Sequence, residues 1–199
     1  LEDLIRGIIV QSGNDACIVL AEGISGSEKN MVEEMNDKGQ ELGLSNSNFQ
    51  NVTGWPHKDH YMSAKDIGNL AKAIIDRFPE YYQLFALTEF EYNDIKQFNR
   101  NELLNFDGFD GLKTGRTTQA GFGLVSSSIR NNRRIVSVVN GLNSNKARVN
   151  ETKKLVNWGF REFRNFDLFG PEDTVIKAKV WLGNKPFAPL VTQENLIIT

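Results

Sequence analysis

The tripeptide Lys113-Thr114-Gly115 stands between a turn rich in glycine and aspartate and a run of small residues. An ammonium and a hydroxyl side by side bind a carboxylate through charge and a hydrogen bond, and a glycine lets an extended ligand lie close to the backbone. These residues predict a site on a strand edge for the carboxylate end of a peptide. For the tripeptide taken alone, an ordinary exposed strand end is the alternative interpretation.

A second polar element, Ser12-Gly13-Asn14, interrupts two apolar helical segments far upstream. The glycine lets this turn bend tightly, so the serine hydroxyl and the asparagine amide are able to face one cleft. The fold would have to bring this turn to Lys113. Alternatively, Ser12 and Asn14 only cap the helix that starts near Asp15, since both residue types cap helices well.

Composition limits the possible functions of the chain. It has 199 residues, of which 40% are hydrophobic and 24% charged, and a net charge of -2, which is typical of a globular domain and not of a nucleic-acid-binding protein. No apolar run is long enough to span a bilayer, and no signal peptide opens the chain. We interpret the basic residues near Arg130 and Arg134 as a solvated hairpin end.

No metal or cofactor is expected. The single cysteine, Cys17, excludes an internal disulfide and a cysteine-based zinc site, and its apolar neighbours predict a packing role. His57 and His60 have a spacing that suits a metal, but no third ligand stands at suitable spacing.

The periodicity of apolar residues predicts an α+β fold. Helical segments are expected up to about Val10, from Asp15, over Lys29 to Leu42, after a capping-box-like start at Ser63, and over Lys146 to Phe163. Strands are expected over Thr88 to Tyr92, Gly121 to Ser128 and Ile135 to Val139, the last two joined by the hairpin signal Asn131-Asn132.

Three parts follow from this pattern: a main domain over 1–165, a linker over 166–173, and the start of a small β-rich domain over 174–199. The linker is predicted from Gly170-Pro171, and the last part from the alternation of Ile176, Ala178 and Val180 with lysines. Because the chain begins and stops inside apolar elements, we expect it to be a piece of a longer protein.

Taken together, these segments resemble the low-molecular-mass penicillin-binding proteins that are D-alanyl-D-alanine carboxypeptidases. These serine peptidases carry Ser-x-x-Lys, Ser-x-Asn and Lys-Thr-Gly motifs. Residues 7–17 resemble the second motif with its flanks, 99–104 and 110–115 the third motif with its approach, 150–160 the closing helix, and 180–183 the start of the β-rich C-terminal domain of the penicillin-binding protein five and six type. The resemblance implies a β-lactamase/transpeptidase-like domain, with an antiparallel sheet and helices and its N-terminal part missing.

The resemblance implies removal of the terminal D-alanine from peptidoglycan stem peptides through an acyl-enzyme on a serine, with inhibition by β-lactams. It gives catalytic roles to three residues of this chain. Ser12 would relay a proton toward the leaving amine, Asn14 would hold the substrate amide and the lysine of the first motif, and Lys113 would supply positive potential.

The same resemblance implies a substrate-binding set, which is Lys113, Thr114, Gly115, Arg116 and Arg148. Thr114 would bind the terminal carboxylate, and the backbone N–H of Arg116 would belong to the oxyanion hole. Arg148 matches an arginine that the family uses near the substrate carboxylate. A surface arginine without function is the alternative for Arg148.

One departure from the family pattern is clear, because no Ser-x-x-Lys occurs in these 199 residues. We therefore expect the chain by itself to be inactive. The membrane anchor typical of these enzymes is also absent, and a periplasmic, inner-membrane-associated location follows only from the resemblance. A non-catalytic peptidoglycan-binding relative stays open as an alternative, as does a class A-type β-lactamase, which the predicted second domain disfavours.

Overall fold

The computed structural model describes residues 1–198, which form two units, Leu1–Asn157 and a second one that begins at Trp158. The first unit is built around an antiparallel sheet of β5 (Phe109–Thr117), β6 (Gly121–Arg130) and β7 (Arg133–Leu142), with β6 in the middle. Asn131 and Asn132 join β6 to β7 with φ angles of 50° and 59°. Asparagine tolerates this left-handed conformation, so the hairpin predicted from the Asn-Asn pair is confirmed.

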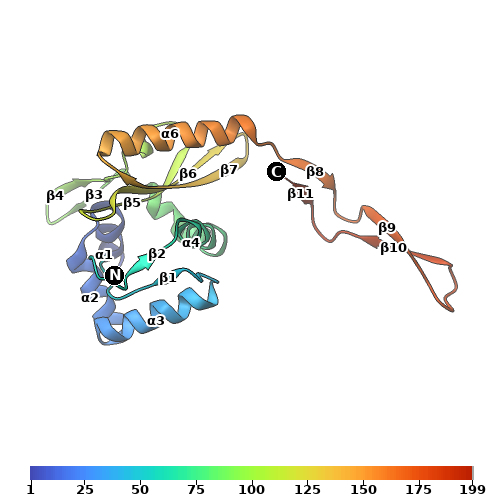
Figure 1. Ribbon diagram of the computed structural model, residues 1–199, viewed down its shortest axis with the longest axis horizontal. Helices are drawn as coiled ribbons and strands as arrows, with labels where there is room; N and C mark the ends of the chain where they lie inside the picture. The colour runs from blue at the N-terminus through green and yellow to red at the C-terminus, as the bar shows by residue number, and fades with distance from the viewer. Residues whose placement is uncertain (199) are drawn as a thin grey trace. The chain divides into compact units, whose positions relative to one another are not determined.

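One long helix covers each face of this sheet. Figure 1 shows α4 (Ala64–Arg77) along one face and α6 (Asn145–Glu162) along the other. On the α4 side, Ala71, Tyr82 and Leu112 form a buried cluster, against which Val125 and Val136 pack from the sheet. On α6, Thr152 and Val156 are fully buried. The predicted closing helix and the helix after Ser63 are both confirmed.

The helices at the start of the chain lie close to the expected segments, and the first of them ends earlier than expected and continues as a π-helix. They are α1 (Glu2–Arg6), the π-helix η1 (Gly7–Gln11), α2 (Asn14–Ser25) and α3 (Glu28–Glu41). Ser27 caps α3 by accepting from the Asn30 N–H at 3.1 Å, and Gly43 follows the helix with a φ of 71°. These are ordinary start and stop signals, which is why the sequence located this part well.

A loop over residues 44–62 crosses from α3 to α4 and contains the short pair β1 (Ser47–Asn48) and β2 (Tyr61–Met62). Ser63 caps α4 by accepting from the Asp66 N–H at 3.1 Å. The buried Asp66 carboxylate instead accepts from the Asn46 N–H at 2.7 Å and the Ser47 hydroxyl at 2.8 Å. Asp66 therefore fastens the loop to the helix.

Between α4 and the sheet the chain makes short elements. They are α5 (Pro79–Tyr82), η2 (Gln83–Ala86), the hairpin of β3 (Glu89–Tyr92) and β4 (Ile95–Phe98), and η3 (Glu102–Asn105). The strand expected over Thr88 to Tyr92 is confirmed as β3. Its partner β4 was not predicted, since Ile95–Phe98 is short and carries two polar residues.

The second unit is made of antiparallel strand pairs. β9 (Thr174–Lys179) pairs with β10 (Phe187–Val191), and β8 (Phe166–Phe169) pairs with β11 (Leu196–Ile198). The β9 strand was expected from its alternation. Within the segment 166–173, which the sequence predicts to be a linker, the first four residues form β8 and pair with β11. These residues form a strand because they pair with β11, which lies far along the sequence. The predicted division at 165 and 174 stays a prediction.

Candidate active site

Ser12 lies at an abrupt change of backbone direction. The π-helix η1 ends at Gln11, and Ser12 takes the left-handed conformation with φ 58° and ψ 46°, while its N–H donates to the Ile8 carbonyl at 3.1 Å. Gly13 is then extended, and α2 starts at Asn14 with no side chain capping it. The capping interpretation of Ser12 and Asn14 is therefore wrong. A serine held in this conformation is strained, and such strain is common at functional sites.

Two hydrogen bonds fasten this turn to the end of β4 and to the residues that follow it. The Gln11 amide donates from Nε2 to the Phe98 carbonyl at 2.8 Å, and the Arg100 N–H donates to the Val10 carbonyl at 3.4 Å. Ser12 is thus held from both sides, by η1 before it and by residues 98–100 beside it.

Strand β5 brings Lys113 to this turn. Lys113 lies opposite Val125 on β6, so both side chains project from the same sheet face, the one on which Val125 packs into the core. The Lys113 ammonium donates hydrogen bonds to the Ser12 hydroxyl and, at 3.3 Å, to the Thr114 carbonyl. The two polar elements that the sequence singled out therefore meet in one site.

The site is electropositive. Burial, together with the nearby cations Arg100 and Arg148, lowers the pKa of Lys113 from 10.5 to about 8, while Cys17 opposes them. Within residues 1–198, Lys113 forms no salt bridge with a carboxylate. Burial also raises the pKa of the Cys17 thiol, which keeps it neutral. A half-buried cation beside a second one favours a bound anion.

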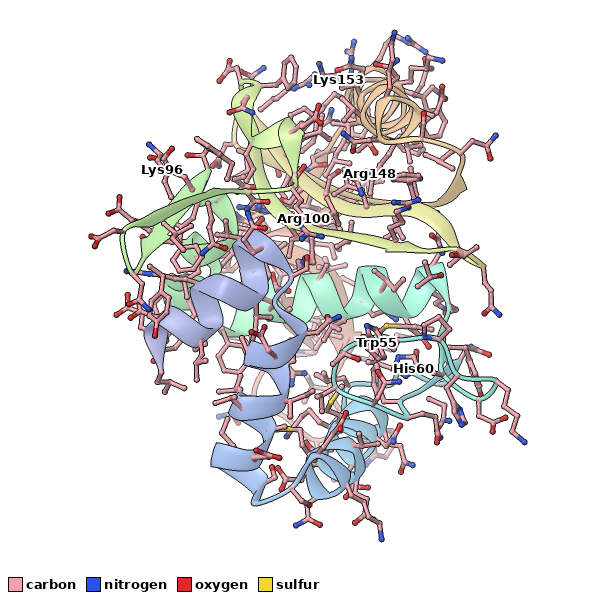
Figure 2. All side chains as sticks on the ribbon, turned by 90° about the vertical axis from the view of Figure 1, so that its left-hand side faces the viewer. Trp55, His60, Lys96, Arg100, Arg148 and Lys153 are labelled. Atoms are coloured by element: carbon pink, nitrogen blue, oxygen red, sulfur yellow. The ribbon has the colours of Figure 1, made fainter. Side chains whose placement is uncertain are left out.

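Arg148 lies inside the protein and is only 6% exposed, so the surface-arginine interpretation is wrong. Its guanidinium donates to the Gly123 carbonyl at 3.4 Å, to the Arg100 carbonyl at 3.3 Å and to the Asn145 side chain. Burial lowers the pKa of Arg148. Arg148 thereby ties α6 to β6 and to the backbone of Arg100, on the α6 side of the sheet, as Figure 2 shows.

The remaining predicted residues line the outer part of β5. Thr114 is half-buried, and Gly115 and Arg116 are exposed. A Cβ atom on Gly115 would meet nothing within 4 Å, which leaves room for a ligand against the backbone. The Arg116 guanidinium lies 4.7 Å from the centre of the Phe122 ring. Among the described strands, β5 pairs only with β6, so its other edge is available for a further strand or an extended peptide.

Sequence reasoning assigned no role to Arg100, although the family resemblance covered its segment. The structure places this exposed arginine close enough to Lys113 to affect its pKa, with its carbonyl held by Arg148. Its neighbours form a tight polar turn, in which Asn99 donates to the Leu87 carbonyl at 2.8 Å and accepts from the Asn101 N–H at 2.8 Å. Figure 2 labels Arg100 and Arg148 near the sheet.

The two histidines take part in the loop over 44–62. The His57 imidazole accepts from the Asp59 N–H at 3.2 Å, and that of His60 accepts from the Gln50 N–H at 3.1 Å. Burial lowers the pKa of His60, which favours its neutral, accepting form. Both rings therefore order the loop through backbone contacts.

Comparison with known proteins decides the family. Residues 1–144 match the model of peptidase family S11, described as D-alanyl-D-alanine carboxypeptidase. The chain belongs to this family. The resemblance inferred from the motifs is thus confirmed.

Individual S11 relatives agree along almost the whole chain. The D-alanyl-D-alanine carboxypeptidase DacC of Escherichia coli is 42% identical over 92% of the chain, and DacA of Haemophilus influenzae is 44% identical over 99%. The alignments cover 46% and 51% of those relatives, so the chain spans about half the length of the curated proteins it matches.

Solved S11 structures match the fold as well. Penicillin-binding protein 5 from Haemophilus influenzae superposes with a TM-score of 0.92 at 41% identity, over 99% of this chain and 58% of that one. Penicillin-binding protein D2 from Listeria monocytogenes, solved with cefotaxime bound, matches with a TM-score of 0.74 at 29% identity, over 79% of this chain and 65% of that one. The predicted α+β fold of transpeptidase type is confirmed.

Proposed function

We propose that the complete protein carrying this sequence is a serine-type D-alanyl-D-alanine carboxypeptidase that removes the terminal D-alanine from peptidoglycan stem peptides and is acylated by β-lactams. Membership of the S11 family supports this function. The observation that carries it is the contact of the Lys113 ammonium with the Ser12 hydroxyl beside an unpaired strand edge. The nucleophile would come from a Ser-x-x-Lys motif, which these 199 residues do not contain.

Substrate binding follows from the charges and the free edge of β5. The cations of Lys113 and Arg100 attract the terminal carboxylate, and the Thr114 hydroxyl would donate a hydrogen bond to it. An extended peptide would add to the edge of β5 through backbone hydrogen bonds, passing over Gly115 where a side chain would interfere. The Arg116 N–H would then face the scissile carbonyl oxygen.

Proton transfer follows from the hydrogen bond between Lys113 and Ser12. Because Ser12 accepts from Lys113, its own proton is available for the leaving amine of the terminal D-alanine. As Ser12 gives that proton to the amine nitrogen, Lys113 replaces it, and Lys113 becomes neutral. A pKa of about 8 suits this exchange, since a lysine at its ordinary 10.5 would release its proton much less readily near neutral pH. Asn14, the first residue of α2, would hold the substrate amide.

A periplasmic location follows from the proposed substrate, which belongs to the cell wall. Within residues 1–198 no helix is both long and apolar enough to cross a membrane. We propose stem peptides ending in D-Ala-D-Ala and β-lactam antibiotics as the partners, without a metal or other cofactor.

The test is labelling of the complete gene product with a fluorescent penicillin, together with D-alanine release from a peptide that ends in D-Ala-D-Ala. We expect a covalent band on a denaturing gel and steady release of D-alanine. Binding of the peptide without labelling or release would instead support a non-catalytic peptidoglycan-binding protein. Rapid hydrolysis of the penicillin without D-alanine release would indicate a β-lactamase.

A further inference from the structure

Asp110 occupies an irregular position in β5, three residues before Lys113. Phe109 lies opposite Ser128 and Gly111 lies opposite Ser127, so Asp110 is the extra residue of a β-bulge. A bulge sets which side chains of the following strand point to which face. If the register of β5 against β6 shifted by one residue, the Lys113 side chain would point to the opposite face of the sheet, away from Ser12. The bulge therefore controls the catalytic lysine.

Three polar side chains from three elements converge on this bulge. The Arg134 guanidinium on β7 approaches both carboxylate oxygens of Asp110, with Nη1 at 2.9 Å from Oδ1 and 2.8 Å from Oδ2. The Tyr82 hydroxyl on α5 donates to Asp110 Oδ1 at 3.0 Å and accepts from Arg134 at 3.2 Å. Arg134 also donates to the buried Ser127 on β6.

The backbone is shaped to admit the tyrosine. A Cβ atom on Gly111, the residue after Asp110, would lie 2.6 Å from the Tyr82 hydroxyl oxygen. The Arg134 guanidinium lies 5.0 Å from the centre of the Tyr82 ring. Burial, with the Asp110 carboxylate beside it, raises the pKa of Tyr82 to about 12, so the hydroxyl stays protonated and keeps donating.

Stability alone does not account for such a cluster. A salt bridge that is mostly removed from water adds little net stability, because desolvation offsets much of the attraction. The hydrogen bonds among Tyr82, Asp110 and Arg134 are directional, however, and their geometry is satisfied in only one register of β5 against β6. In this protein that register also presents Lys113 to Ser12.

We propose that Tyr82, Asp110 and Arg134 are positioning residues, which hold the bulge of β5 in one register and thereby keep Lys113 against Ser12. The inference deepens the proposed function, since it concerns the same site. The placement of Lys113 is nevertheless measurable without catalysis, so the two proposals fail separately.

The decisive measurement is the pKa of Lys113 in the complete protein, followed by NMR of its ε-carbon and assigned with the Lys113→Arg variant. The groups that act on this lysine are Ser12, Cys17, Arg100 and Arg148. Removing the Asp110 negative charge by itself lowers the pKa of a nearby lysine. Exposure of the Lys113 ammonium to water has the opposite effect and raises the pKa of Lys113. We therefore expect Asp110→Ala to move the pKa upward from about 8 toward 10.5, and an unchanged or lower value overturns the proposal.

Tyr82→Phe is the conservative second variant, because it removes one hydroxyl and keeps the ring. We expect it to raise the Lys113 pKa in the same direction by a smaller amount. Ala71→Gly is the matched control, since it loosens α4 in the same core cluster without touching the polar side chains. If Ala71→Gly shifts the pKa as much as Tyr82→Phe at equal loss of stability, the cluster is only structural.

Acylation by penicillin gives a second readout. Because Lys113 is misplaced in Asp110→Ala, we expect the acylation rate of this variant to fall about 100-fold, the loss that a 1 Å displacement causes in other enzymes. We also expect the decline of its acylation rate at alkaline pH to begin at a higher pH. If the wild-type protein did not react with penicillin at all, the proposed function would be overturned. The Lys113 pKa would still decide the positioning role.

Discussion

The Lys113 ammonium donates a hydrogen bond to the Ser12 hydroxyl, which joins residues 101 positions apart in the sequence. The lysine comes from a regular strand, and the serine from a strained turn between two helices. Because the contact lies beside the unpaired edge of β5, it combines charge, a proton donor and a place for an extended peptide. The testable consequences below follow from this contact and from the residues that support it.

Lys113→Ala should lower the rate of acylation by penicillin about 100- to 1,000-fold, because a preorganised charge at the reacting centre is lost. Stopped-flow labelling of the complete protein measures this rate. Lys72→Ala is the matched control, since Lys72 is an exposed lysine on α4 that pairs with Asp76 of the same helix. Its acylation rate should be unchanged, and an equal loss in both variants would contradict the role of Lys113.

Affinity for a peptide carboxylate should decline as pH rises through about 8, because Lys113 then loses its charge. Stability should respond in the opposite direction. The folded pKa lies below the unfolded value of 10.5, so the unfolded chain binds more protons between about pH 8 and 10.5. The contribution of Lys113 to the free energy of unfolding therefore increases with pH across this window. Peptide titrations and urea unfolding measure the two trends, and Lys113→Arg should remove both.

Two substitutions of Ser12, whose backbone is left-handed, separate the effect of its hydroxyl on activity from the effect of its conformation on stability. Both Ser12→Ala and Ser12→Gly lose the bond to Lys113 and should lose most activity. Glycine adopts φ 58° without strain, whereas alanine does not, so the glycine variant should be more stable by about 1 kcal/mol. Urea unfolding of the two variants provides the comparison. An alanine variant as stable as the glycine variant would show that the turn is not held in this conformation.

Arg148 and Arg100 should respond differently to substitution. Arg148→Ala removes a buried donor from the carbonyls of Gly123 and Arg100 and should lower the free energy of unfolding by about 2 kcal/mol or more. Arg100→Ala removes an exposed side chain and should leave stability within about 0.5 kcal/mol, while raising KM for the peptide. Thermal unfolding and steady-state kinetics test the pair. A stable Arg148→Ala protein with only a raised KM would favour direct carboxylate binding by Arg148.

Two glycines of β5 offer a contrast between binding and folding. A methyl group on Gly115 meets nothing within 4 Å, so Gly115→Ala should fold normally but bind the peptide less tightly. On Gly111 the same methyl group would lie 2.6 Å from the Tyr82 hydroxyl, so Gly111→Ala should be clearly less stable. Melting temperatures and peptide affinities measured together would contradict this interpretation if both variants lost stability equally.

Much of the fold was predictable because its signals are local. Ser27 and Ser63 cap their helices, Asn131-Asn132 forms the hairpin turn, and the apolar spacing located α3, α4 and α6. The motif residues Ser12 and Lys113 were also visible in the sequence, because their side-chain chemistry is independent of the fold. Strands β4 and β8 were missed, since each is short and depends on its partner for its extended form.

The sequence by itself determined the main helices, the hairpin of β6 and β7, the family and the residue types of the site. Only the tertiary structure decided that Ser12 faces Lys113 instead of capping α2, that Arg148 is interior, and that Arg100 lies within range of the lysine. It alone brought Tyr82 and Arg134 onto the bulge at Asp110. The reason is physical, because charge, burial and hydrogen bonding at these residues arise from neighbours on other elements, which no local pattern encodes.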